Sequence, residues 1–344
     1  MSLFMSDNTA CACPEVMDAI VAANSGTAAS YGADPWSERL QRTLSQVFET
    51  DVAVFPVVTG TASNALALSA VTPAFGTIYC HEFAHIYTDE CGAPELFTGG
   101  AKLIPLRGDN ARFSAADLAS TIRGHGNVHH AQPSTVSITQ ASEAGTVYRL
   151  DEISEIAEVS QSHGLTVHMD GARFANGLVS LGVGPAEMTW KAGVKVLSFG
   201  GTKNGCLAAE AVVFFEPGMA EIFPYLQKRG GQLLSKMRFV SAQLEAYLSD
   251  DLWLCNARHA NAMATRLSAG LAVLPGIELA YPTESNEVFV RLPSSTVERL
   301  KSAGFVVNEG ELDGSAARFV TTWNTEPEDV DSLLAALAEQ NEGD

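Results

Sequence analysis

His168-Met-Asp170-Gly-Ala-Arg173 is the most informative stretch of this sequence. The apolar residues before Asp170 predict a buried strand, and the small residues after it predict a turn that leads to Arg173. In open parallel sheets, ligands bind beyond the carboxyl ends of the strands, where a carboxylate can pair with a cationic ring nitrogen. We therefore expect Asp170 and Arg173 in a binding site. The alternative is structural, with Asp170 capping a helix and Arg173 in a surface ion pair.

A second turn of small residues holds a lysine. Residues 194–199 predict a strand, and Gly200-Gly-Thr-Lys203-Asn-Gly205 follows it. The chain has seven lysines, of which Lys203 alone lies in a glycine-rich turn after a strand. Glycines let the backbone approach a ligand closely, and a desolvated lysine near another cation becomes a Schiff-base nucleophile. A solvated loop lysine is the alternative interpretation.

The third stretch, Thr59-Gly60-Thr61, joins a predicted strand at 52–58 to a predicted helix at 62–70. Backbone N–H groups at a helix N-terminus favour a phosphate dianion, although Thr-Gly-Thr is also an ordinary helix cap. Together, the three stretches supply a phosphate anchor, a carboxylate and a lysine. Pyridoxal phosphate requires this set, because it carries a phosphate, a pyridine nitrogen and an aldehyde.

Predicted strands alternate with predicted helices over the first two thirds of the chain. Strand-like runs lie at 52–58, 77–80, 136–139, 166–169, 194–199 and 211–215, and the helical stretches include 36–49, 62–70 and 150–162. This alternation implies crossover connections and a mostly parallel sheet, which places the chain in the α/β class.

After residue 216 the pattern changes. Long helices are predicted at 233–248 and 252–274, followed by short strands at 287–292 and 318–322 and by helices at 297–303 and 329–338. A length of 344 residues suggests two domains at about 150 residues each. We predict an irregular N-terminal segment near the active site at 1–35, a large cofactor-binding α/β domain at 36–250 and a small α+β domain at 251–344.

Composition excludes several classes of protein. The chain has 21 Lys and Arg against 40 Asp and Glu, which argues against nucleic-acid binding because phosphate neutralisation needs clustered basic residues. No apolar run reaches the roughly 20 residues of a membrane helix, and the N-terminus does not resemble a secretory signal. The six cysteines do not form a disulfide framework. We expect a cytoplasmic protein without membrane partners.

Two patterns could indicate a metal. His81-Glu-Phe-Ala-His85 matches H-E-x-x-H, which binds zinc when it lies on a helix. Here the residues before His81 read as a strand, so stacking on a flat cofactor is the better role for His85. Cys11 and Cys13 form Cys-x-Cys, but no second pair follows at zinc-site spacing. We therefore expect no metal.

The three stretches in this order resemble the low-specificity L-threonine aldolases, fold-type-I pyridoxal phosphate enzymes of the beta-eliminating lyase/threonine aldolase family. The likeness covers nearly the whole chain. It includes Ser6-Asp-Asn8, Tyr31-Gly-Ala-Asp-Pro35, Gly60-Thr61, His85, Asp170-Gly-Ala-Arg173, Lys203 and Ala317-Arg318. It implies a mostly parallel central sheet with helices on both faces and a smaller α+β C-terminal domain.

The resemblance also implies how the cofactor is held. Gly60 and Thr61 would bind the phosphate, and His85 would stack on the pyridine ring. Asp170 would pair with the ring nitrogen, and Lys203 would hold the cofactor as a Schiff base. Arg173 would lie beside both the cofactor and the substrate carboxylate.

By the same resemblance, Arg318, Arg173 and Ser6 bind the substrate carboxylate. Tyr31 comes from a neighbouring chain, which implies a homodimer or homotetramer with shared active sites. The substrate is a small β-hydroxy-α-amino acid. The activity is the cleavage of L-threonine or L-allo-threonine to glycine and acetaldehyde.

The sequence departs from the family pattern at two places that affect the site. Thr139-Gln-Ala-Ser-Glu143-Ala-Gly145 lacks the histidine of the family's Asn-Thr-His-Asn-Gly string, so the base is His85, Glu143 or a water that they hold. A phosphate-binding Gly-Gly-Gly-Met-Arg string is replaced by residues 229–236, in which Arg229 or Lys236 is the phosphate-binding cation.

Other functions remain as alternatives. A related pyridoxal phosphate lyase, such as a phenylserine-type aldolase or a β-eliminating lyase, would use the same constellation, because the reaction depends on which bond lies perpendicular to the ring. A binding module or a zinc hydrolase built on His81 and His85 belongs to a different class.

Overall fold

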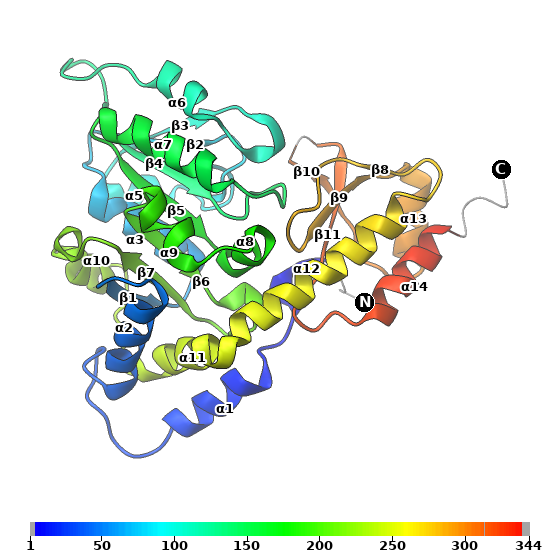
Figure 1. Cartoon of the computed structure of the whole chain (residues 1–344), viewed down its shortest axis with the longest axis horizontal. Helices are drawn as coiled ribbons and strands as arrows, with labels where there is room; N and C mark the ends of the chain where they lie inside the picture. Colours follow the sequence, from blue (N-terminus) through cyan, green and yellow to red (C-terminus); the bar gives the residue numbers. More distant parts are fainter. Residues whose placement is uncertain (1–3, 313, 339–344) are drawn as a thin grey trace.

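The computed structural model describes residues 4–312 and 314–338. Its larger part is built on a seven-stranded sheet with the order β1-β7-β6-β5-β4-β2-β3 (Figure 1). The strands are β1 (Ala53–Val57), β2 (Gly76–His81), β3 (Lys102–Leu106), β4 (Gln132–Thr139), β5 (Thr166–Gly171), β6 (Val196–Gly200) and β7 (Glu210–Phe214). The strands from β3 to β6 pair in parallel, whereas β7 and β1 are antiparallel to their neighbours. The predicted α/β fold with a mostly parallel sheet is confirmed.

Helices cover both faces of this sheet, because its central strands are apolar on both sides. Along β6, Leu197 and Phe199 belong to the main core, while Val196 packs in a second cluster with Leu66 of α3 and Phe223 of α10. The helices of this part are α1 (Pro14–Ala23), α2 (Pro35–Val47), α3 (Gly60–Val71), α4 (His85–Thr88), α5 (Ala93–Thr98), α6 (Ala115–Thr121), α7 (Leu150–Ser162), α8 (Phe174–Leu181), α9 (Pro185–Met188), α10 (Phe223–Arg229) and α11 (Arg238–Leu248). Burial on both faces is typical of parallel sheets.

A smaller antiparallel sheet has the order β10-β11-β9-β8. Its strands are β8 (Glu278–Leu279), β9 (Glu287–Arg291), β10 (Asn308–Glu311) and β11 (Ala316–Val320), and its helices are α13 (Ser294–Ser302) and α14 (Pro327–Ala338). The long helix α12 (Leu252–Leu271) runs between the two parts (Figure 1). Trp253 and Ala257 at its start pack in the main core, whereas Ala264 and Leu267 pack in the core of the small sheet.

The domain division at residues 35 and 250 stays a prediction, and its outer ends, 1–3 and 339–344, lie outside the described residues. The prediction of an irregular segment over 1–35 was wrong, because Pro14–Ala23 forms helix α1 and buries Val16. The helix predicted at 233–248 begins only at Arg238. Among the described residues, no helix is both long and apolar enough to span a membrane.

Candidate active site

A cavity of about 700 Å³ lies beyond the carboxyl ends of the parallel strands. This is a usual size for a small-molecule site. Of the residues predicted from the sequence, those that line it are Ser6, Gly60, Thr61, His85, Glu143, Asp170, Arg173, Lys203 and Arg318. The fold therefore brings together side chains from β5, the turn after β6, the start of α3 and the small sheet.

Asp170 lies near the end of β5 and is almost fully buried at the cavity. Its Oδ1 atom accepts the backbone N–H of Ala172 at 3.0 Å. Its Oδ2 atom accepts a hydrogen bond from Nδ2 of Asn64 at 2.7 Å. These two bonds orient the carboxylate, so that a cationic group in the cavity would meet a fixed negative charge.

The N-terminus of α3 is open toward the cavity. The Thr59 side chain accepts the backbone N–H of Ala62 at 3.1 Å and so caps the helix. Gly60 and Thr61 line the cavity, and apart from the adjoining residues of its own helix and chain no atom lies within 4 Å of the place where a side chain at Gly60 would begin. The first N–H groups of a helix have no partner within the helix, so this end can bind an anion.

Lys203 lies in a single 3-10 turn, Thr202–Asn204, directly after β6. The backbone before it is tightly packed: a Cβ atom at Gly200 would lie 2.5 Å from the carbonyl oxygen of Ala172. The Gly201 N–H donates to Oε2 of Glu210 at 2.9 Å. Burial raises the pKa of Glu210 to about 7. Sequence reasoning missed Glu210; its signal was an acidic residue at the start of an apolar strand.

A chain of polar contacts connects His85 with Asp170. His85 Nδ1 lies 2.9 Å from Oε1 of Glu90, and that oxygen also accepts a hydrogen bond from Asn64 Nδ2 at 2.8 Å. Because Asn64 donates to Asp170 as well, one amide group bridges two carboxyl groups. The hydrogen bond with Glu90 raises the pKa of His85, and burial raises the pKa of Glu90. Sequence reasoning missed both Asn64 and Glu90; Asn64 could have been noticed as a polar residue in an apolar helix.

Glu143 lies next to His85 in the wall of the cavity. Its Oε1 atom accepts the backbone N–H of His85 at 2.7 Å, and the Thr139 hydroxyl lies 3.4 Å from the same oxygen. Burial, followed by the charge of Asp170, raises the pKa of Glu143 to about 7. The carboxyl group is therefore able to change its protonation state near neutral pH.

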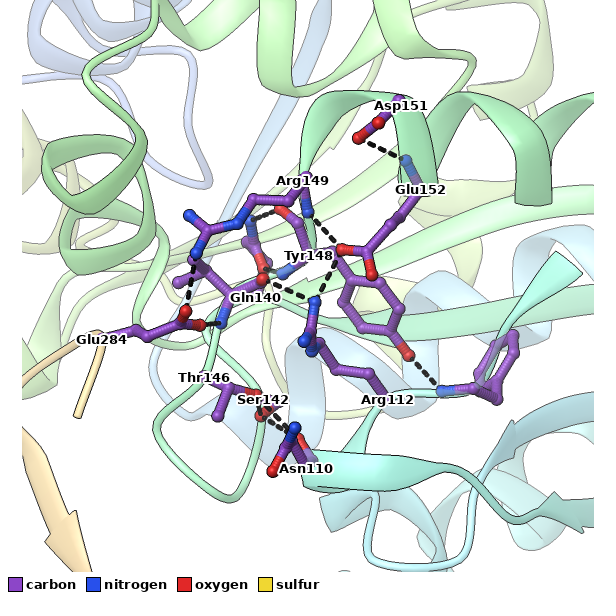
Figure 2. A network of polar contacts seen from close by, with 12 residues as sticks. Asn110, Arg112, Gln140, Ser142, Thr146, Tyr148, Arg149, Asp151, Glu152 and Glu284 are labelled. Atoms are coloured by element: carbon purple, nitrogen blue, oxygen red, sulfur yellow. Dashed lines mark hydrogen bonds and ion pairs between the residues drawn. The ribbon is translucent and has the colours of Figure 1, made fainter. Parts of the chain in front are cut away.

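The segment that carries Glu143 is held by polar contacts on several sides (Figure 2). The Gln140 amide donates to the carbonyl of Tyr148 at 3.0 Å and accepts the Tyr148 N–H at 2.9 Å. The Thr146 hydroxyl donates to the carbonyl of Asn110 at 2.7 Å. Glu284, from the segment before β9, contacts Arg149 at 2.6 Å and accepts the Val147 N–H at 2.8 Å. The small sheet thus helps to position this segment.

Arg173, Arg318 and Glu287 line the end of the cavity near the small sheet, and Asp7 lies behind Arg173. Arg173 donates from Nε and Nη2 to the two carboxyl oxygens of Asp7, at 2.8 and 3.1 Å. Nη2 of Arg173 also lies 3.1 Å from Oε1 of Glu287, and Nη1 of Arg318 lies 3.8 Å from the same oxygen. Sequence reasoning placed Arg173 and Arg318 here but missed the role of Asp7 and the presence of Glu287.

Three predicted residues do not line the cavity of this chain: Tyr31, Arg229 and Lys236. The Tyr31 side chain is half exposed, and Nζ of Lys228 lies 4.7 Å from the centre of its ring. Arg229 is the last residue of α10, and Lys236 precedes α11.

The H-E-x-x-H match does not lie on a single helix. His81 is the last residue of β2, and His85 is the first residue of the short helix α4. The His81 ring accepts the Phe83 N–H at 3.1 Å and lies 3.2 Å from the carbonyl of Gly108. Both ring nitrogens of His81 are therefore engaged by the backbone.

Comparison with known proteins finds relatives along nearly the whole chain. A family model described as "Beta-eliminating lyase" matches residues 4–294. Low specificity L-threonine aldolases from Pseudomonas sp. (strain NCIMB 10558) and Pseudomonas aeruginosa are each 43% identical over 334 residues, which is 97% and 96% of this chain and 96% and 95% of theirs. A solved structure of a Leishmania major threonine aldolase has a TM-score of 0.92 at 27% identity and covers 98% of this chain and 99% of its own.

Proposed function

Because the chain belongs to the beta-eliminating lyase family, we propose that it is a low-specificity L-threonine aldolase with pyridoxal phosphate as its cofactor. Its substrates are L-threonine and L-allo-threonine, and its products are glycine and acetaldehyde. The observation that carries this proposal is that Lys203, Asp170 and the N-terminus of α3 line one cavity.

The residues around the cavity fit this cofactor. Asn64 Oδ1 and Glu90 Oε2 are buried at the cavity without a hydrogen-bond partner among the described residues, so a polar ligand would satisfy them. The open helix end at Gly60 and Thr61 suits a phosphate. Asp170 would hold the ring nitrogen, and Lys203 would hold the aldehyde carbon. Arg229 or Lys236 of another copy would add a cation to the phosphate.

When bound, pyridoxal phosphate supplies an electron-accepting ring that stabilises negative charge at the substrate α-carbon. With the cofactor bound, the buried carboxylate of Asp170 would favour the protonated form of the ring nitrogen. His85 contributes a flat ring at the cavity wall. Glu90 and Asn64 keep His85 and Asp170 in fixed positions through their shared hydrogen bonds.

Arg318, Arg173 and Ser6 bind the substrate carboxylate and so fix which bond of the α-carbon faces the ring. Arg173 is oriented by its two hydrogen bonds with Asp7, which leave the guanidinium edge nearest the cavity in one position. Positioning of this kind lowers the entropic part of the barrier.

The base that removes the β-hydroxyl proton is Glu143, His85 or a water that they hold. Both side chains line the cavity, and the Glu143 carboxyl is bonded to the backbone N–H of His85. A base is most effective when its pKa lies near the working pH. The pKa of Glu143, raised by burial to about 7, suits that role.

The assembly is a homodimer or homotetramer with active sites shared between chains, and the protein works in the cytoplasm. Tyr31 would reach the substrate of the neighbouring chain. The exposure of the Tyr31 side chain and of Tyr225 on α10 supports this, since exposed aromatic side chains are common at interfaces.

The test is an absorbance spectrum of the purified protein before and after L-threonine is added, with Lys203→Ala alongside. A lysine-bound form of the cofactor absorbs near ~420 nm. Wild type should show this band and release acetaldehyde and glycine, and Lys203→Ala should lack the band. A band without an aldehyde product would overturn the substrate, and ammonia with a keto acid would indicate a β-eliminating lyase. No band after cofactor is supplied would overturn the site.

A further inference from the structure

Two buried carboxyl groups lie at the end of the cavity that would hold the substrate carboxylate: Glu287 lines the cavity, and Asp7 lies behind Arg173. Asp7 and Glu287 are each no more than 2% exposed, and both contact Arg173. With Arg318, the cluster has two positive and two negative groups. A third carboxylate would therefore enter a buried site that has no excess positive charge, which is unfavourable.

Asp7 is held firmly in its charged form. It accepts two hydrogen bonds from Arg173 and a third from Asn286 Nδ2 at 3.2 Å. Burial opposes the charge, but the Arg173 guanidinium and these bonds outweigh it and hold the pKa of Asp7 below its usual range.

Glu287 is held much less firmly. Neither of its carboxyl oxygens has a hydrogen-bond partner among the described residues, although both are buried. Its contacts are the ion pairs with Arg173 at 3.1 Å and Arg318 at 3.8 Å. Burial raises the pKa of Glu287 in spite of the two guanidinium groups.

From this contrast we propose that Glu287 takes up one proton from solvent when the substrate carboxylate binds and then holds that carboxylate as a neutral carboxylic acid. This inference rests on the proposed function. The proton satisfies an oxygen of Glu287 that has no partner, because the new O–H can donate to the carboxylate. It also leaves the cluster with one positive charge for the incoming negative one. The proton returns to solvent when the amino acid leaves.

The charged groups that face Glu287 come from four segments. They are Asp7 of the N-terminal turn, Arg173 after β5, Lys203 after β6 and Arg318 on β11. The charge of Lys203 also lowers the pKa of Asp7, Glu143 and Glu210. In the loaded enzyme the Lys203 amine would be bonded to the cofactor. Asp7 stays ionised near neutral pH, and a guanidinium group does not lose its proton in proteins. Glu287 is therefore the group of this cluster that can change its charge.

The experiment measures glycine binding to the loaded enzyme between pH 6 and pH 9. Glycine carries the carboxylate but has no bond to cleave, so binding is followed by the absorbance change of the cofactor. Glu287→Gln keeps the size and offers an N–H donor without a charge. Glu278→Gln, on the same small sheet but at an exposed ion pair with Arg291, is the matched control. Calorimetry in two buffers with different ionisation enthalpies counts the protons taken up.

Above the pKa of Glu287, wild type and Glu278→Gln should bind glycine more weakly as the pH rises. Their Kd should increase by about a factor of ten for each pH unit, beyond any increase seen in Glu287→Gln. Wild type should take up one proton more than Glu287→Gln. The same pH dependence and proton count in all three proteins would overturn the inference and leave the proposed function intact. If wild type binds no amino acid at any pH, the proposed function fails as well.

A second measurement needs only the wild-type enzyme, in case Glu287→Gln does not fold. Difference infrared spectra distinguish a protonated carboxyl group from a carboxylate. Adding glycine at pH 8 should produce a new band of a protonated carboxyl. If no such band appears while glycine is bound, the inference is wrong.

Discussion

His85 Nδ1 lies 2.9 Å from Oε1 of Glu90, and the Glu90 carboxyl is buried while the imidazole reaches the cavity. A histidine that donates its Nδ1 proton to a carboxylate presents its other nitrogen as an acceptor. In this protein the same carboxyl is also bonded to Asn64, which donates to Asp170. Glu90 therefore positions His85 and connects it to the predicted partner of the cofactor ring.

Replacing Glu90 by Gln should lower the pKa of His85, and if His85 is the base, the acidic limb of the activity profile should shift to lower pH with it. The Glu90 carboxylate raises the pKa of His85, and the neutral amide removes that effect while still offering an oxygen to Nδ1. The pH dependence of kcat for wild type and Glu90→Gln measures the shift. Glu90→Ala, which also removes the contact, serves as the comparison. If the acidic limb lies at the same pH in wild type and Glu90→Gln, the titration of His85 does not cause it.

Glu143→Gln should lower turnover by about 10²- to 10⁴-fold, the usual contribution of a general base. The amide oxygen can still accept the His85 N–H, so the cofactor content and the fold should be unchanged. In wild type, turnover should rise with pH through about 7, because Glu143 acts as a base only when it is ionised. Equal turnover in the variant would remove Glu143 from the list of bases.

Glu210→Gln should stabilise the cofactor-free protein at alkaline pH. The folded pKa of about 7 lies above the ordinary value of 4.5, so the folded state keeps a proton that the unfolded state has lost. The contribution of Glu210 to stability therefore falls between pH 4.5 and 7, by about 3 kcal/mol in total at 1.36 kcal/mol per pKa unit. Urea unfolding at pH 5 and pH 8 should show that the advantage of the variant grows with pH. A constant difference would contradict this interpretation.

Asp7→Ala should destabilise the cofactor-free protein by about 3 kcal/mol, because it leaves the buried Arg173 without its main partner. This loss lies at the low end of the usual range for breaking a buried ion pair, since Glu287 also contacts Arg173. The pKa of Asp7 is lowered in the fold, so its stabilising effect is present above the unfolded value of 3.8 and is lost as the pH falls through the folded value.

The matched control for Asp7→Ala is Asp331→Ala, which breaks an exposed ion pair with Arg266. An exposed pair contributes about 1 kcal/mol or less. Urea unfolding at pH 7 should therefore separate the two variants clearly. Similar losses in both would mean that Arg173 finds another partner when Asp7 is removed.

Local patterns predicted much of the fold. The helix predicted at 150–162 has the observed bounds of α7, and the strand predicted before Asp170 is β5. Apolar periodicity succeeds there because each residue's burial follows from its own position on a helix or strand. Helix α1 was missed because its small and apolar residues give no clear stripe, although Pro14 at its first position favours a helix start.

The sequence alone predicted the α/β class and the strand ends that carry Asp170 and Lys203, because these features depend on residues adjacent in the chain. The partners of those side chains did not follow from it. Glu90, Glu210 and Glu287 come from separate segments and meet at the cavity only in the folded chain. The charge that each carboxyl carries depends on burial and on neighbours distant in sequence. For that reason the electrostatics of the site belong to the folded chain and cannot be read from any one motif.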